Sequence, residues 1–202
     1  MTFEYEKQAL SEGYNIVCGV DEAGRGPLCG PVCAAAVVLP TDCEIEGIND
    51  SKKLSEKKRD MLYDIIKEKA LAYSVVMVDA ATIDEINILQ ATFKAMRQAV
   101  EGLSIKPDIA LIDGNQKPGL DIEERTLVKG DAKSISIAAA SILAKVTRDR
   151  YCLEMDKKYP EYQFAKHKGY GTKQHMDALR TYGPSPIHRK QFIRFLDKDA
   201  DK

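Results

Sequence analysis

Gly19-Val20-Asp21-Glu22-Ala23-Gly24-Arg25-Gly26-Pro27 is the most informative segment of this 202-residue chain. Two adjacent carboxylates follow an apolar strand predicted over residues 14–20, and a Gly-Arg-Gly turn comes directly after them. Carboxylate oxygens suit hard divalent cations. Glycines let the backbone and a fixed positive charge come close to a phosphate. Metal-binding carboxylates next to a turn suited to phosphate binding indicate phosphodiester chemistry.

Composition and net charge exclude few classes of protein. A hydrophobic content of 44% and a charged content of 30% are typical of a soluble globular protein with one sizeable core. The net charge of −1 does not advertise nucleic-acid binding, but residues 166–194 are rich in Lys, Arg and His, which is compatible with a basic face. The five cysteines, the polar N-terminus and the short apolar runs predict a cytoplasmic protein that does not enter membranes.

Hydrophobic periodicity predicts a mixed sheet covered by helices. Strands at 14–20 and 31–39 are joined by a short glycine-rich link, which favours antiparallel pairing. Capping signals and helical spacing predict helices elsewhere. Further strands are expected at 73–78, 108–113 and 125–128, and helices at 3–12, at 55–72 after a Ser55 cap, from a Thr82 and Glu85 capping box to Gly102, and from about Ser134.

The composition changes at about residue 159, where prolines and glycines become frequent. One helix is predicted near residues 172–182. We therefore expect a main α/β domain over residues 1–158. A small helical and loop-rich substrate-binding extension is expected over residues 159–202.

Four acidic residues each follow a β-like stretch: Asp21, Glu22, Asp113 and Asp131. Strands joined by helical crossovers tend to lie parallel and to bind ligands at their C-terminal ends, so Asp21 and Asp113 meet if their strands are neighbours. Consecutive strand side chains point to opposite faces, so Asp21 and Glu22 share a site only if the strand bends or ends between them.

An all-oxygen ligand set favours Mg²⁺ or Mn²⁺ over zinc. Two such cations about 3.5–4 Å apart activate a water and stabilise a leaving 3′ oxygen. The alternative is structural, because aspartates at strand ends also cap helices or start turns. Asp131, just before a helix, is the best candidate for that alternative.

Residues 19–27 resemble the signature of the type 2 ribonuclease H family, specifically ribonuclease HII. Other segments resemble the family in the same order: residues 50–55, 87–92, 112–114, 129–133 with 144–146, 168–172 and 185–189. The resemblance covers nearly the whole chain. It implies an α/β ribonuclease H-like mixed β-sheet flanked by helices, with a small C-terminal helical extension. The related type HIII enzymes usually carry an extra N-terminal domain, and nothing before Tyr14 is long enough for one.

The resemblance also implies a function: endonucleolytic hydrolysis of the RNA strand of RNA–DNA hybrids, and incision at single ribonucleotides in duplex DNA, as ribonucleotide excision repair requires. The product would carry a 5′-phosphate, and the cofactors would be two Mn²⁺ or Mg²⁺ ions. The catalytic metal ligands would be Asp21, Glu22, Asp113 and Asp131.

Substrate-binding residues follow from the same resemblance and from local chemistry. The turn made by Gly24, Arg25 and Gly26 would recognise the ribose 2′-hydroxyl, which distinguishes RNA from DNA, and Tyr170 would stack at the RNA–DNA junction. Residues close to helix starts or in basic sequence are expected to contact phosphates: Lys52, Lys53, Ser134, Ser136, His188 and Arg189.

Two other functions stay open at this point. A DNA-directed nuclease of the same fold would not depend on the 2′-hydroxyl. A non-catalytic hybrid-binding module would tolerate loss of the carboxylates, and the presence of all four argues against it. We expect a monomer. The apolar segment at residues 192–196 fits either a sliding-clamp partner or a docked helix.

Overall fold

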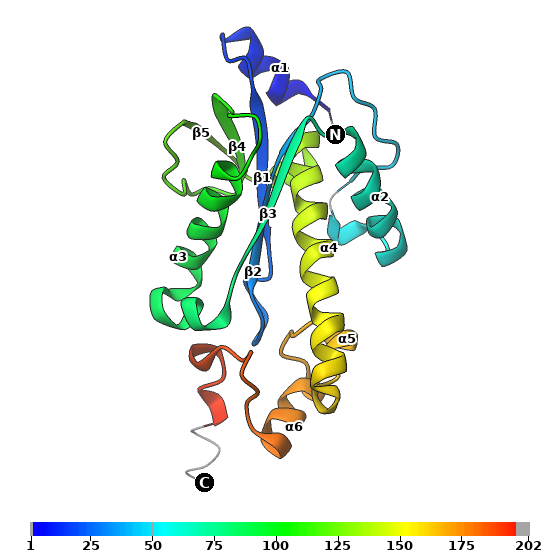
Figure 1. Ribbon diagram of the computed structural model, residues 1–202, viewed down its shortest axis with the longest axis vertical. Helices are drawn as coiled ribbons and strands as arrows, with labels where there is room; N and C mark the ends of the chain where they lie inside the picture. Colours follow the sequence, from blue (N-terminus) through cyan, green and yellow to red (C-terminus); the bar gives the residue numbers. More distant parts are fainter. Residues whose placement is uncertain (1, 50, 197–202) are drawn as a thin grey trace.

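The computed structural model describes residues 2–49 and 51–196. A five-stranded sheet in the order β3-β2-β1-β4-β5 forms its centre, with helices on both faces (Figure 1). β1 pairs antiparallel with β2 and parallel with β4, while β2–β3 is antiparallel and β4–β5 parallel. The predicted mixed sheet is confirmed. The strands are β1 (Val17–Ala23), β2 (Val32–Val38), β3 (Ala72–Val78), β4 (Ile109–Asp113) and β5 (Glu123–Leu127).

Helix α3 covers one face of the sheet, and α4 with α2 covers the other (Figure 1). The α-helices are α1 (Glu4–Ser11), α2 (Glu56–Lys69), α3 (Ala80–Glu101), α4 (Ile135–Lys158), α5 (Phe164–His167) and α6 (Lys173–Tyr182). Both faces of β2 are buried. This burial explains why β2 is a continuous apolar run without the polar alternation of a half-exposed strand.

The N-terminal turn of α4 lies directly on β1 at Gly19. A Cβ atom at Gly19 would lie 2.1 Å from the carbonyl carbon of Ser136 and 2.3 Å from the backbone nitrogen of Ile137. Only a residue without a side chain permits this approach. The contact fixes α4 against the strand that carries Asp21 and Glu22.

Element boundaries differ from the predictions by a few residues, and two of the differences concern β1 and α3. β1 continues through both carboxylates to Ala23, because these residues pair with β2, so the strand does not end between Asp21 and Glu22. Helix α3 starts at Ala80, and Asp79 rather than Thr82 caps it, since the Asp79 side chain accepts the Thr82 N–H. Within α3, Asn87 has a φ of 67°, and its side chain accepts the N–H groups of Leu89 and Gln90. Asn87 therefore caps the second half of a kinked helix.

Ser134 and Ser136 serve the packing of α1 against α4. Both are buried. The Ser134 hydroxyl caps α4 through the Ile137 N–H and donates to Glu6 Oε1, and Glu6 Oε1 also accepts the Ser136 N–H. The prediction that these serines contact phosphate is wrong, because the carboxylate of Glu6 already occupies their side of the helix start.

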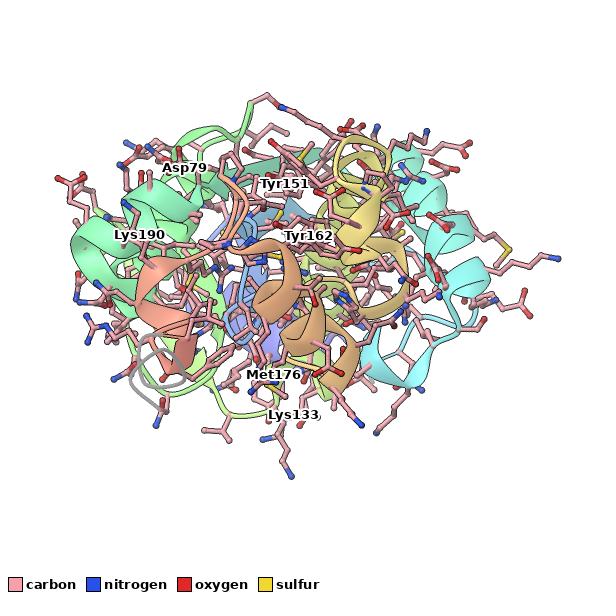
Figure 2. The ribbon with its side chains drawn as sticks, turned by 90° about the horizontal axis from the view of Figure 1, so that it is seen from below. Asp79, Lys133, Tyr151, Tyr162, Met176 and Lys190 are labelled. Atoms are coloured by element: carbon pink, nitrogen blue, oxygen red, sulfur yellow. The ribbon has the colours of Figure 1, made fainter. Side chains whose placement is uncertain are left out.

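The C-terminal segment packs at one end of the sheet. Figure 2 looks onto this end, where Tyr162 lies centrally and Lys190 lies beside α3. Buried residues of this segment form an apolar cluster with Cys29 and Cys152. Ile193 is buried in that cluster, so the 192–196 segment is docked. The domain division at residue 158 stays a prediction, and residues 197–202 lie outside the described part.

Within residues 2–49 and 51–196, no helix has both the length and the apolar character needed to cross a membrane.

Replacing Gly19 with alanine should destabilise the fold by about 3 kcal/mol or more, because the added methyl would overlap the backbone of α4, which cannot rotate away as a side chain can. Chemical denaturation measures this change. Gly171→Ala is the matched control, since a Cβ there meets Leu28 only at 3.4 Å or more. Equal stabilities of the two variants would contradict the close packing of α4 on β1.

Candidate active site

The register of two parallel strands brings Asp21 next to Asp113. Val20 on β1 is the partner of Ile112 on β4, and each aspartate is the next residue along its strand. The sequence-based expectation that these two carboxylates meet at one sheet edge is confirmed. Because both strands are flanked by further strands and covered by α4, the two backbones have little freedom to move apart.

Asp131 joins this pair through the loop after β5. It lies in the short 3₁₀ helix η2 (Gly130–Ala132) and is almost fully buried. The N–H of Gly130 donates to Asp113 Oδ1 at 2.7 Å, and the N–H of Asp131 approaches the same oxygen at 3.4 Å. Since Ser134 caps α4, Asp131 is not the cap of that helix.

Glu22 completes the cluster although it follows Asp21 on a continuous strand. Its carboxylate interacts electrostatically with Asp113 and with Lys52, and its Oε1 lies 3.4 Å from Nη1 of Arg25. Lys52 in turn has its Nζ 3.9 Å from Oδ2 of Asp131. Contacts thus link the four acids in pairs, with Arg25 and Lys52 at their rim.

Burial and nearby negative charge make Asp21 and Glu22 reluctant to ionise. The pKa of Asp21 is raised well above its ordinary value, first by burial and then by the charges of Glu22 and Asp113. Hydrogen bonds from the Ser141 side chain and from the Glu22 N–H oppose this rise only in part. Burial also raises the pKa of Glu22, against the attraction of Arg25. Additional positive charge would reduce the repulsion between these carboxylates.

A pocket of about 200 Å³ opens beside the acids. The Gly-Arg-Gly turn (residues 24–26) forms one wall, and Tyr170 lies across it, since a Cβ on Gly26 would lie 3.6 Å from Tyr170 Cε1. Tyr170 is 47% exposed, so much of the residue is open to solvent. Lys52 and Lys53 lie in η1 (Ser51–Lys53) and are exposed, and Lys52 lines the pocket.

His188 and Arg189 do not form a surface patch. Both are buried, and Arg189 is fully so. Arg189 donates to carbonyls inside the protein, and His188 Nε2 meets His175 Nε2 at 2.9 Å. The prediction that they contact the DNA backbone is wrong, because their polar atoms already bind protein groups. His167 and His175 are buried as well.

Four residues at the site were not predicted: Ser51, Ser141, Lys145 and Arg148 line the same pocket. Ser141 bonds Asp21 and lies 2.9 Å from the Ser51 hydroxyl. The spacing of 141, 145 and 148 places these three residues on one face of α4. That polar stripe, which begins within the apolar first half of the helix, was the available signal.

Carboxylates gathered at the carboxyl ends of neighbouring parallel strands, under a glycine turn, define a nuclease of the ribonuclease H-like class. The ribonuclease HII family model matches residues 18–195. The ribonuclease HII of Caldicellulosiruptor bescii is 58% identical over 192 residues, which is 95% of this chain and 93% of that protein.

Solved structures agree. The ribonuclease H2 of Pyrococcus horikoshii superposes with a TM-score of 0.77 at 31% identity, covering 93% of this chain and all of that one. The ribonuclease HII of Archaeoglobus fulgidus, solved in complex with PCNA, gives a TM-score of 0.70 at 26% identity, over 88% of this chain and 93% of that one. The chain belongs to the ribonuclease HII family. It is therefore an endoribonuclease, a hydrolase of the ribonuclease H type, and the non-catalytic module is set aside.

The raised pKa of Asp21 predicts how the stability of the metal-free chain depends on pH. The folded state holds this proton more tightly than the unfolded state, so this contribution to stability is lost as pH rises from the ordinary value of 3.8 through the folded pKa. We expect Asp21→Asn to have a higher free energy of unfolding than wild type near pH 7, with the difference shrinking toward pH 4. Denaturation in EDTA across this range measures it.

Asp121→Asn, at an exposed loop position, is the control and should leave the pH profile unchanged. Adding Mg²⁺ should stabilise wild type more than Asp21→Asn. A variant that is less stable than wild type at pH 7 without metal would contradict the repulsion described above.

Proposed function

We propose that this enzyme hydrolyses the RNA strand of RNA–DNA hybrids, incises duplex DNA at single ribonucleotides, and uses two divalent cations to do so, leaving a 5′-phosphate. One observation supports this most directly: Asp21, Glu22 and Asp113 lie together at the ends of β1 and β4, beside a glycine turn and an exposed tyrosine. The acidic groups would bind the cations, and the turn and the tyrosine ring would bind a nucleotide.

The residues present fit a pair of hard cations. Every candidate ligand is a carboxylate oxygen, which suits Mg²⁺ or Mn²⁺. The crowded charge that raises the pKa of Asp21 would be offset by bound cations. The ligands would be Asp21, Glu22, Asp113 and Asp131. When bound, the ions would supply an activated water and neutralise charge at the phosphate.

The chain's own groups would orient the substrate. Peptide groups of the 24–26 turn would hydrogen-bond the ribose 2′-hydroxyl, and Tyr170 would stack on the base or sugar at the junction. Lys52 and Lys53, exposed at the start of the segment leading into α2, would bind phosphates. Gly130 N–H donates to the Asp113 carboxylate and so restricts its orientation.

A sliding clamp is a candidate partner. The Archaeoglobus fulgidus relative was solved in complex with PCNA. In this chain Ile193 is buried and its neighbours pack on the domain, so residues 192–196 would have to undock before a clamp could bind them. A monomer remains our expectation.

Asp113→Asn should abolish cleavage of a duplex that contains one ribonucleotide, with substrate binding retained or improved, because the variant loses a metal-binding charge and some repulsion of phosphate. Cleavage is measured with Mg²⁺ and with Mn²⁺, and binding by fluorescence anisotropy. Asp121→Asn should cleave like wild type.

The same assay tests the DNA-directed alternative. Wild type should leave the all-DNA duplex intact under conditions in which the one-ribonucleotide duplex is cut. Equal cleavage of the two duplexes would favour a DNA-directed nuclease, and unchanged turnover by Asp113→Asn would exclude the metal mechanism.

Tyr170→Ala should weaken substrate binding by about 10- to 100-fold, the loss expected for one stacking contact of about 1–3 kcal/mol. Tyr170→Phe keeps the ring and should stay within a few-fold of wild type. KM on the one-ribonucleotide duplex measures the effect. Tyr182→Ala, at an exposed tyrosine ending α6, is the control. Equal losses in the alanine and phenylalanine variants would exclude stacking as the role of the ring.

A further inference from the structure

Arg189 is a buried charge whose partners are backbone carbonyls of the β1–β2 connection, which includes the 24–26 turn. Its Nε donates to Gly30 O at 2.9 Å, and its Nη1 donates to Arg25 O and Pro27 O at 3.0 and 2.9 Å. Its Nη2 donates to Gly24 O at 2.6 Å. Burying a guanidinium is costly unless its donors are satisfied. Here the β1–β2 connection that borders the active site satisfies them.

The bonds to Gly24 and Arg25 also set the direction of two N–H groups. The described residues contain no cis peptide. In a trans peptide the carbonyl and the N–H of the next residue point in opposite directions. Because Arg189 draws the carbonyls of Gly24 and Arg25 inward, the N–H groups of Arg25 and Gly26 point away from Arg189.

Arg148 of α4 supports the connection between β1 and β2 from a second side. It is almost fully buried and donates to Pro31 O at 3.1 Å, Cys29 O at 3.1 Å and Lys168 O at 2.9 Å. A Cβ on Gly24 would lie 2.1 Å from Arg148 Nε, so the turn rests directly on this side chain. Lys168 is two residues before Tyr170, so Arg148 joins the turn to the segment that carries the tyrosine.

A histidine pair extends this support. Ser185 N–H donates to His188 Nδ1, so His188 carries its proton on Nε2 and donates it to His175 Nε2 at 2.9 Å. His175 then donates from Nδ1 to the Tyr170 carbonyl at 3.0 Å. The Cys29 Sγ atom lies within 4.8 Å of a ring nitrogen of each histidine, and cysteine and histidine are residue types that bind metals. The proton on His188 Nε2 occupies one of the ligating atoms, so these bonds account for the histidines without a metal.

We propose that Arg189 and Arg148 are positioning residues for ribonucleotide recognition: they fix the peptide groups of residues 24–26 at a set distance from Tyr170, and so make hydroxyl recognition possible. This role rests on the proposed function. A glycine-flanked turn has wide conformational freedom by itself. The two guanidiniums restrict that freedom, and the 2′-hydroxyl meets donors that are already oriented.

The test uses full-length Asp113→Asn, which should bind without cutting, and two DNA duplexes that differ only in one ribose 2′-hydroxyl. Affinities are measured in Mg²⁺ by fluorescence anisotropy. The parent should prefer the ribonucleotide duplex. Adding Arg189→Lys should reduce that preference by about tenfold, the loss expected for one hydrogen bond to the hydroxyl, with little change in affinity for the all-DNA duplex. Lysine keeps the charge but cannot span the carbonyls.

Arg148→Lys in the same background should act in the same direction and serves if Arg189→Lys unfolds, which thermal denaturation reports. Arg150→Lys, an exposed position on α4, is the matched control and should keep the parental preference. Merely structural damage lowers the competent fraction for both duplexes and leaves their ratio unchanged. A parental ratio in both folded variants overturns the positioning role alone, whereas a parent without any preference overturns the proposed function as well.

Discussion

Repulsion among acids held at the end of β1 is the constraint around which the molecule is organised. Asp21 is buried beside Glu22 and Asp113, and this arrangement opposes ionisation. A loose support would let the carboxylates separate and expose themselves to water. The central position of β1 and β4 in the sheet, and the contact of α4 with Gly19, prevent that separation. The hydrophobic layers on both faces supply the stability that such a site consumes.

Helix α4 connects the acidic cluster to the glycine turn. Near its start it rests on β1, one turn further along Ser141 bonds Asp21, and two turns beyond that Arg148 holds the carbonyls of Cys29 and Pro31. A rigid helix thus fixes the distance between the acids and the turn. Arg148 also donates to Lys168 O, and His175 bonds the Tyr170 carbonyl, which adds Tyr170 to this frame.

The sequence was sufficient for features that depend on local pattern. Alternating strands and helices predicted the sheet, and strand-end aspartates predicted that Asp21 meets Asp113, because parallel strands end at one edge. The sequence did not allow us to predict which polar groups are buried. Ser134 and Arg189 look like phosphate ligands by residue type, yet their partners lie more than 100 residues away in the chain, at Glu6 and Gly24. The left-handed Asn87 that kinks α3 was equally hidden, since its capping sites exist only once the helix has formed.

The glycines of the 24–26 turn illustrate how flexibility in sequence becomes rigidity in structure. Gly24 has a φ of +94° and no room for a side chain, so glycine is needed to reach this conformation. The same freedom would let an isolated turn leave the conformation again. Rigidity therefore has to come from groups outside the turn, and two buried guanidiniums can provide it because each spans several carbonyls at once. The chemistry of the turn and the position of the C-terminal segment are, for this reason, parts of one site.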